Sequence, residues 1–216
     1  MSLTLRELTL EELADLHATE LSEAFPPEER KPFAAMATLV RRGAYHPLGA
    51  WEGETLVGYA LLWTGPSAPY VLVDYLGVTA ARRGGGLGGE ILRLLRARFR
   101  GWDGILVESE APQGGEKDAL QRRRLAFYGR CGFVPMGYDC LLFGVHYRTF
   151  LLSPNGRGTE QAALAAHQAL YAAQFPPDQL ARYIQIPLDP DKPLQAAGSW
   201  AGKTDLPGRE EKGVSV

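Results

Sequence analysis

Residues 82–89, with the sequence RRGGGLGG, have the composition of an anion-binding loop. They follow an apolar, β-favouring run that ends at Val78, and they lead into an amphipathic segment on which Ile91, Leu94 and Leu95 share one face. A glycine-rich turn between a strand and a helix exposes backbone N–H groups, and the helix dipole favours negative charge there. The sequence therefore predicts a site for a nucleotide or a phosphorylated cofactor.

One interpretation of this loop is a dinucleotide site. Gly84, Gly86 and Gly89 fit the pattern G-x-G-x-x-G, and Glu108 lies at about the distance expected of an acid that binds the ribose. In that fold the first glycine ends the strand, whereas here residues 79–83 intervene. The sequence also shows no further βαβ units after the motif, so this interpretation is the weaker one.

The second interpretation is a loop whose amides wrap a pyrophosphate. Arg83, Gly86 and Gly88 fit the pattern R-x-x-G-x-G, and two arginines at the turn suit a ligand with several phosphate charges. A purely structural role, in which glycines allow a strand and a helix to pack closely, needs fewer glycines than the five found here. We therefore favour the pyrophosphate loop.

This loop, together with a second element, resembles the acetyl-CoA-binding motif of the GNAT superfamily of N-acetyltransferases. The second element is AFYGRCGF, residues 126–133, and a strand predicted at residues 105–110 separates the two. The resemblance implies that the backbone N–H of Leu76 stabilises the thioester oxyanion and that Val78 pairs with the pantetheine arm. It also implies that Tyr128 is the general acid near the CoA sulfur.

The same resemblance assigns the pyrophosphate of acetyl-CoA to the loop that contains Arg83, Gly84, Gly86 and Gly88. Basic residues 122–124 could contact the 3′-phosphate of CoA, although a solvated helix face explains that run more simply.

Acetyl transfer to an amine also needs a base, because a protonated amine is not nucleophilic. Three carboxylates on predicted strands are candidates: Asp74, Glu108 and Glu110. Period-two alternation places Glu108 and Glu110 on one face of their strand, and Asp74 on the same side as Leu76 and Val78. A carboxylate in a buried strand is either a tuned base or a paired structural acid. We prefer Glu108 as the base.

The amino-acid composition is that of a globular protein. Of the 216 residues, 45% are hydrophobic and 22% charged, as in an ordinary globular domain, and the net charge of −2 gives no electrostatic reason to expect nucleic-acid binding. No apolar run is long enough to span a membrane, and the N-terminus lacks the features of a signal peptide. Two cysteines, Cys131 and Cys140, indicate a reducing compartment, so we expect a cytoplasmic enzyme.

The histidines lack the spacing of metal ligands, and we predict no metal; we interpret each as an individual surface or core residue. They are His17, His46, His146 and His167.

The predicted elements give an α+β order with a GNAT-like mixed, mostly antiparallel central sheet flanked by helices. Thr9 and Glu12 form a capping box for a helix whose buried face is Leu13, Leu16, Leu21 and Ala24. The remaining predictions are strands at 3–7, 48–52, 55–63, 138–143 and 145–152, and helices at 33–42 and from Asp118 to a left-handed cap at Gly132.

Residues 1–155 are predicted to form the acetyltransferase domain and residues 156–216 a C-terminal helix and loose tail. The helix is expected at residues 159–175, with Leu164, Ala165, Gln168 and Tyr171 near one face. Beyond Pro187 the composition offers little apolar surface to bury. The extension is either a packing helix, which we favour, or a homodimer contact or a flap over the acceptor site.

The predicted function is an acetyl-CoA-dependent N-acetyltransferase that acts by direct transfer in a ternary complex. The acceptor is a primary amine of a small molecule or peptide, shaped by the first two helices and their connection. The charged run Glu28 to Lys31 in that connection could bind a cationic amine or merely solvate a turn. Two alternatives are an acyl-CoA sensor module without turnover and a dinucleotide-binding oxidoreductase.

Overall fold

The computed structural model describes residues 2–25, 27–65 and 68–192, and in this part of the chain eight strands form one sheet in the order β1-β2-β3-β4-β5-β7-β6-β8. Every neighbouring pair is antiparallel except β4 and β5, which are parallel. The predicted α+β class with a mixed, mostly antiparallel sheet is therefore confirmed. The strands are β1 Leu3–Glu7, β2 Tyr45–Glu52, β3 Thr55–Thr64, β4 Tyr70–Val78, β5 Gly104–Glu110, β6 Val134–Leu142, β7 Val145–Leu152 and β8 Ile184–Gln185.

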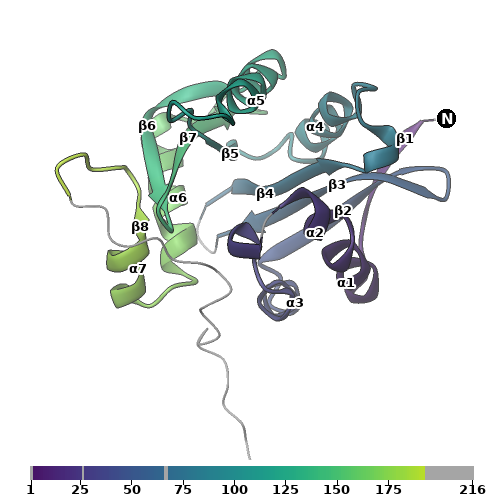
Figure 1. The fold of residues 1–216 in the computed structure, drawn as a ribbon, viewed down its shortest axis with the longest axis horizontal. Helices are drawn as coiled ribbons and strands as arrows, with labels where there is room; N and C mark the ends of the chain where they lie inside the picture. The colour runs from purple at the N-terminus through teal and green to yellow at the C-terminus, as the bar shows by residue number, and fades with distance from the viewer. Residues whose placement is uncertain (1, 26, 66–67, 193–216) are drawn as a thin grey trace, which may run out of the picture.

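Helices cover both faces of the sheet, with α4 and α5 on one face and α1, α2 and α3 on the other (Figure 1). Each face has its own apolar core. One core includes Leu13, Met36 and Leu170, and the other includes Ile91 and Tyr128. The helices are α1 Leu10–Ala18, α2 Glu20–Ala24, α3 Phe33–Arg41, α4 Leu87–Arg98, α5 Asp118–Arg130, α6 Glu160–Ala172 and α7 Pro177–Tyr183.

The capping box at the start of α1 is confirmed. The Thr9 hydroxyl accepts from the N–H of Glu12, and the Glu12 carboxylate accepts from the N–H of Thr9. The prediction that this helix continues to Ala24 is wrong. The backbone of Thr19 leaves the helical region, its hydroxyl donates to the carbonyl of Asp15 at 2.7 Å, and the short helix α2 starts afresh. Ala24 is exposed rather than buried.

Two strands begin three or more residues earlier than predicted. β2 starts at Tyr45 and contains Pro47. Proline is unusual inside a strand because it has no N–H to donate to a neighbouring strand. Pro47 lies just past the end of β1, whose pairing with β2 stops at Leu48, so the ring does not interrupt that ladder. β6 starts at Val134 instead of Tyr138. The left-handed cap at Gly132 is confirmed, with φ of 87°.

A β-bulge in β4 changes which way its side chains point. Leu61 of β3 faces Tyr75 and Leu62 faces Val73, so Asp74 is an extra residue on β4. The bulge reverses the alternation of side chains beyond it. Leu76 packs on the core under α4 and α5, whereas Asp74 bonds to side chains on the opposite face. The prediction that Asp74 shares a side with Leu76 and Val78 is therefore wrong.

The bulge coincides with a separation of the two parallel strands. The pairing of β4 with β5 covers Tyr70–Val73 and Gly104–Val107 and then ends. β4 continues to Val78 paired with β3, and β5 continues to Glu110 paired with β7. The sheet is thus split in its middle, directly after Val73 and Val107.

The C-terminal segment packs against the sheet. α6 buries a face made of Ala163, Ala166, His167, Leu170 and Tyr171, while Ala165 and Gln168, predicted near the same face as Tyr171, are exposed. β8 then pairs with β6. The predicted loose tail beyond residue 192 lies outside the described residues. Among the described helices, none has both the length and the apolar character needed to cross a membrane.

Candidate active site

The glycine-rich loop has the conformation that its sequence predicts. Gly84 and Gly86 have φ of 87° and 78°, a region that favours glycine, and Gly86 is the N-cap of α4. A Cβ at either position would meet no atom within 4 Å, so the backbone conformation, rather than lack of space, requires glycine. The first turn of a helix has N–H groups without intrahelical partners, and these groups lie at the loop.

Gly88 is required for a different reason. A Cβ there would lie 3.3 Å from Cζ of Phe127, so any other residue would make a tight contact with that ring, which would have to shift slightly. The adjacent helix face has Ile91, Leu92 and Leu95 buried, whereas Leu94, predicted to be on that face, is only half-buried.

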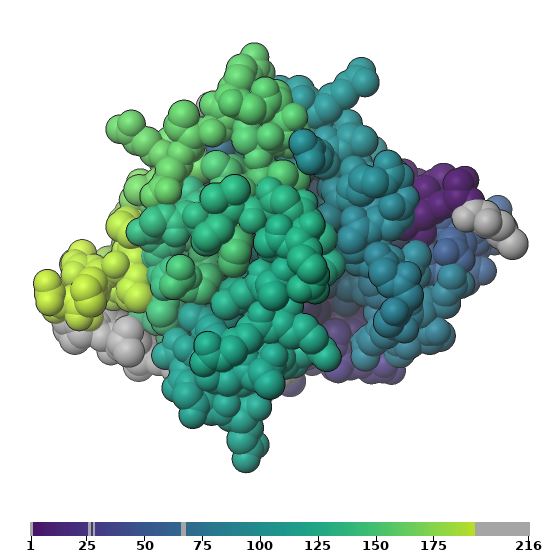
Figure 2. Space-filling model, turned by 90° about the horizontal axis from the view of Figure 1, so that it is seen from above, coloured from purple at the N-terminus to yellow at the C-terminus, as the bar shows by residue number. Residues whose placement is uncertain are grey.

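A cavity of about 630 Å³ lies between this loop, the end of β4 and α5. Figure 2 looks onto this side of the molecule, with α5 near the centre and α4 beside it. Five of the predicted site residues line the cavity: Leu76, Val78, Arg83, Gly88 and Tyr128. Gly84 and Gly86 belong to the loop that continues from Arg83. The sequence-predicted cofactor residues are thus brought together.

Arginines surround this cavity. Arg83 lines it from the loop, while Arg123, Arg124 and Arg130 line it from α5. Arg122, by contrast, pairs with Asp118 on the exposed side of the helix at 3.2 Å. All three residues 122–124 are exposed, as the solvated-face interpretation predicts, and Arg123 and Arg124 also line the cavity, which is therefore suited to a ligand with several phosphates.

Tyr128 lies in the wall of the cavity with its ring in the apolar core. The ring contacts Phe127, Phe133 and Phe150, at centroid distances of 5.3, 5.6 and 6.0 Å. Burial raises the pKa of Tyr128 to about 12, an effect that Arg124 partly opposes. The hydroxyl therefore carries its proton at neutral pH and is available as a hydrogen-bond donor.

At the split in the sheet, Asp74 is bound by a buried lysine. Lys31 Nζ lies 2.7 Å from Asp74 Oδ2, and the Tyr45 hydroxyl donates to the same oxygen at 2.5 Å. The Lys31 side chain is 1% exposed, and its Nζ lies 4.2 Å from the ring centroid of Trp63. Sequence reasoning took Lys31 as part of a solvent-facing or amine-binding charged run; in the structure it is a core residue.

Glu108, on the other side of the split, is bound by two residues of α6. His167 Nε2 lies 2.6 Å from Glu108 Oε1, and the Tyr171 hydroxyl donates to both carboxylate oxygens at 3.0 and 3.1 Å. The hydroxyl of Tyr138 lies 3.0 Å from His167 Nδ1. Glu108 is not among the residues that line the 630 Å³ cavity. A ribose-binding role, which the dinucleotide pattern would give it, does not fit this position.

Glu108, His167 and Cys140 place one ligand atom each within 4.8 Å of one another. An ion between nitrogen and oxygen would hold each at about 2.0–2.2 Å, which requires them to be further apart than the observed 2.6 Å between Nε2 and Oε1. Burial also raises the pKa of the Cys140 thiol well above its usual value and so disfavours the thiolate that binds metals. We interpret the three as a hydrogen-bonded cluster, and the absence of a metal stays a prediction.

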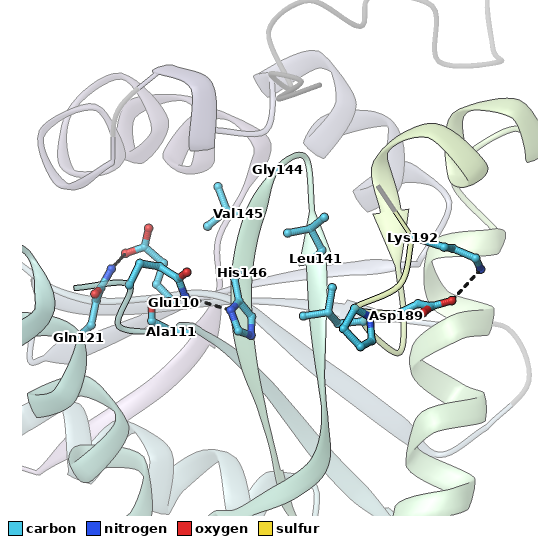
Figure 3. A pocket seen from close by; sticks show the side chains of 12 residues that line it. Glu110, Ala111, Gln121, Leu141, Gly144, Val145, His146, Asp189 and Lys192 are labelled. Carbon is cyan, nitrogen blue, oxygen red and sulfur yellow. Dashed lines mark hydrogen bonds and ion pairs between the residues drawn. The ribbon is translucent and has the colours of Figure 1, made fainter. Parts of the chain in front are cut away.

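Glu110, the third candidate base, contacts α5 instead of α6. Its Oε2 accepts from Gln121 Nε2 at 3.4 Å and lies 3.8 Å from Arg124 Nη1. It also lines a second cavity of about 430 Å³, shown in Figure 3, which the β6–β7 turn and residues 188–192 enclose. Figure 3 shows the Glu110 and Gln121 side chains directed toward each other at one edge of this cavity. The two glutamates of β5 thus have partners on different helices.

Sequence reasoning missed Lys31, His167 and Tyr171. Nothing in the mixed charges and prolines around Lys31 indicates burial. The spacing of four between His167 and Tyr171 does place both on one helix face, and this was the available signal.

Comparison with known proteins agrees with this geometry. The sequence model of the Acetyltransferase (GNAT) family matches residues 10–133. The protein YjbC of Bacillus subtilis (strain 168), which carries an acetyltransferase name, is 35% identical over 113 residues, which are 51% of this chain and 53% of that protein. The chain thus spans about half the length of this curated relative.

Solved structures share the fold. A GNAT-family protein from Bacteroides thetaiotaomicron superposes with a TM-score of 0.60 at 21% identity, covering 76% of this chain and 94% of the other. The spermidine N-acetyltransferase from Vibrio cholerae, in complex with CoA and spermine, gives 0.55 at 14% identity, covering 72% and 97%.

The Lys31–Asp74 pair gives a first prediction. Lys31→Met should lower the free energy of unfolding by about 3 kcal/mol, because it leaves the largely buried Asp74 carboxylate without its cation. Lys31→Met combined with Asp74→Asn should recover part of that loss. Lys192→Met is the control, since its pair with Asp189 is exposed and should contribute below about 1 kcal/mol. Urea unfolding measures all three, and equal effects for Lys31→Met and Lys192→Met would contradict the buried pair.

Proposed function

This chain belongs to the GNAT acetyltransferase family, and we propose that it transfers an acetyl group from acetyl-CoA to a primary amine. The observation that carries the proposal is the 630 Å³ cavity, where the glycine loop, four arginines, the free end of β4 and Tyr128 meet. This cavity has both charged and apolar walls, which suits an elongated cofactor with a pyrophosphate at one end and a thioester at the other. The Vibrio cholerae neighbour, whose structure holds CoA and spermine, supports CoA as the carrier and an amine as the acceptor.

The proposed cofactor residues follow from their places around the cavity. Arg83 and the loop glycines Gly84, Gly86 and Gly88 would hold the pyrophosphate. Val78, on the part of β4 that β5 has left, would pair with the pantetheine arm as an added strand does. The N–H of Leu76 would then donate to the thioester oxygen as it becomes an oxyanion.

Glu108 is the proposed base. Asp74 is already bound to Lys31 and Tyr45, which supports a structural role for it. Glu110 is directed to α5 and lies near Arg124. Glu108 is the carboxylate at the split whose partners are a histidine and a tyrosine, and side-chain burial places it away from bulk water. A carboxylate of this kind is suited to accept a proton from an ammonium group.

The proposed reaction is a direct transfer in a ternary complex. Glu108 takes a proton from the amine, the nitrogen attacks the thioester carbon, and the C–N bond forms. The tetrahedral oxyanion accepts a hydrogen bond from the backbone N–H of Leu76. Its collapse breaks the C–S bond, the sulfur leaves with the electron pair beside Tyr128, and the nitrogen releases its second proton to solvent to give the neutral amide.

The acid role of Tyr128 is proposed mainly as hydrogen-bond donation. A thiol of the Cys type has a pKa of about 8.5, whereas burial raises the pKa of Tyr128 to about 12. Complete proton transfer from the phenol to the thiolate is therefore unfavourable in free energy, given the pKa that Tyr128 has without a bound ligand. A donated hydrogen bond still stabilises the charge that develops on sulfur, and the free thiolate can be protonated by water after release.

A screen for CoA release tests the proposed function. Wild-type protein with acetyl-CoA is assayed against polyamines, amino acids, aminoglycosides and peptides with free amino termini. At least one class should raise CoA release well above the amine-free rate, with the acetylated amine seen by mass spectrometry. Absence of acetyl transfer across the panel, with acetyl-CoA bound, would favour a sensor module instead.

Gly86→Asp should abolish acetyl-CoA binding in a folded protein. The new carboxylate would face the pyrophosphate, and its side chain would block the approach to the backbone. Gly43→Asp is a matched control, because Gly43 also has a positive φ, of 69°, and open space at its Cβ, but lies after α3. Isothermal titration with acetyl-CoA measures the effect. Equal affinities for the two variants would show that the loop does not bind the cofactor.

Tyr128→Phe should lower turnover about 10²-fold with little change in acetyl-CoA binding. The variant removes a hydroxyl and keeps the ring contacts with Phe127, Phe133 and Phe150. Rates are measured with the panel amine that gives the highest wild-type rate. An unchanged kcat would mean that the sulfur leaves without help from Tyr128.

A further inference from the structure

Helix α6 follows the family-matched residues 10–133, yet it supplies two of the side chains that bind Glu108. His167 and Tyr171 are one helical turn apart and both are buried, at 0% and 3% exposure. Both point polar atoms at one carboxylate, which begins the part of β5 that no longer pairs with β4. An apolar helix face would pack equally well without these groups, so their presence needs a reason beyond packing.

The hydrogen-bond directions follow from the tyrosines. Burial raises the pKa of the Tyr138 hydroxyl, so this group keeps its proton, and we assign that proton to the 3.0 Å contact with His167 Nδ1. With this assignment His167 carries its proton on Nε2 and donates it to Glu108 Oε1. Tyr171, whose pKa burial also raises, donates to both carboxylate oxygens. The charged form of Glu108 thus accepts hydrogen bonds from two side chains of α6.

We propose that His167 and Tyr171 are positioning residues that hold Glu108 as an oriented, charged carboxylate for amine deprotonation. This inference rests on the proposed function, in which Glu108 is the base. It assigns α6 to the active site, not to an accessory extension. The bonds from these two residues of α6 fix the orientation of the Glu108 carboxylate.

The other groups near Glu108 could not replace a lost α6 hydrogen bond in stabilising the charged carboxylate. Tyr138 and Cys140 on β6 and Tyr147 on β7 are kept neutral by burial, which raises the pKa of each. Asp74 on β4 adds negative charge near Tyr171, and Glu29 and Glu110 add it near Tyr147. The ammonium of Lys31 is paired with Asp74. Removing one α6 donor should therefore favour the protonated, inactive form of the base.

Two substitutions at His167 separate its two contacts. The amide nitrogen of Gln can take the place of Nε2, so His167→Gln keeps a donor to Glu108 and loses the acceptor for Tyr138. The shorter Asn places its carboxamide oxygen near Nδ1, so His167→Asn keeps the acceptor for Tyr138 and loses the donor to Glu108. Gln168→Ala is the control on the same helix, because Gln168 bonds to the carbonyl of Ile186 instead.

The readout is the pH dependence of kcat/KM with acetyl-CoA and the panel amine that gives the highest wild-type rate. In the profile of kcat/KM against pH, the acid limb is the range where the rate falls as the pH is lowered. In His167→Asn this limb should move to higher pH by about one unit, so that kcat/KM at a pH within it should fall about tenfold. His167→Gln and Gln168→Ala should keep the wild-type limb. A solely structural role predicts equal losses of stability for the two His167 variants and an unmoved limb, and that result would overturn the inference.

Tyr171→Phe provides an independent test if His167→Asn does not fold. It removes the hydroxyl while the ring keeps its contact with Trp63, at a centroid distance of 5.1 Å, and its acid limb should also move upward. An unmoved limb in Tyr171→Phe overturns the inference. A wild-type protein that binds acetyl-CoA but acetylates none of the panel amines would instead refute the proposed function, and this inference would fall with it.

Discussion

The separation of β4 from β5 after Val73 and Val107 is the constraint on which the rest of the structure depends. Parallel strands that part in mid-sheet expose backbone groups that would otherwise pair, and this costs free energy unless a ligand or side chains satisfy them. The extra residue Asp74 in β4 coincides with the point of separation and increases the local bend. Three parts of the proposed site lie along this opening: the free edge of β4, the glycine loop that follows it and the carboxylate of Glu108.

The carboxylates at the opening are held by distant parts of the chain. Lys31, in the connection before α3, neutralises Asp74, while His167 and Tyr171 of α6 bind Glu108. Trp63 of β3 contacts one partner of each carboxylate, since Lys31 Nζ lies over its ring and Tyr171 packs against it. A buried carboxylate with a cation is suited to structure, and one with neutral donors keeps the capacity to take a proton. These different partners support a structural role for Asp74 and the proposed chemical role for Glu108.

Local patterns predicted the fold and the conformation of the glycine loop. The glycine loop, the capping box at Thr9 and the left-handed cap at Gly132 each depend on a few adjacent residues, and all three have the expected geometry. The surroundings of the three candidate carboxylates could not be predicted in the same way. One bulge residue reverses the side-chain alternation of β4, so period two misplaces Asp74. Burial of Lys31 and the contact of His167 with Glu108 arise from tertiary packing, which single-sequence patterns do not encode.

The role of the C-terminal segment follows from the same contacts. A helix that only covered apolar surface would need residues such as Ala163 and Leu170, which α6 has. It would not need a buried histidine between Tyr138 and Glu108, because each buried polar group has to be hydrogen-bonded in the folded state. The complete chain Tyr138–His167–Glu108–Tyr171 meets that requirement, and it joins β6, α6 and β5 through polar groups. A division of the chain at residue 155 would therefore separate the proposed base from the groups that hold it, so we propose that α6 and the acetyltransferase domain act as one unit.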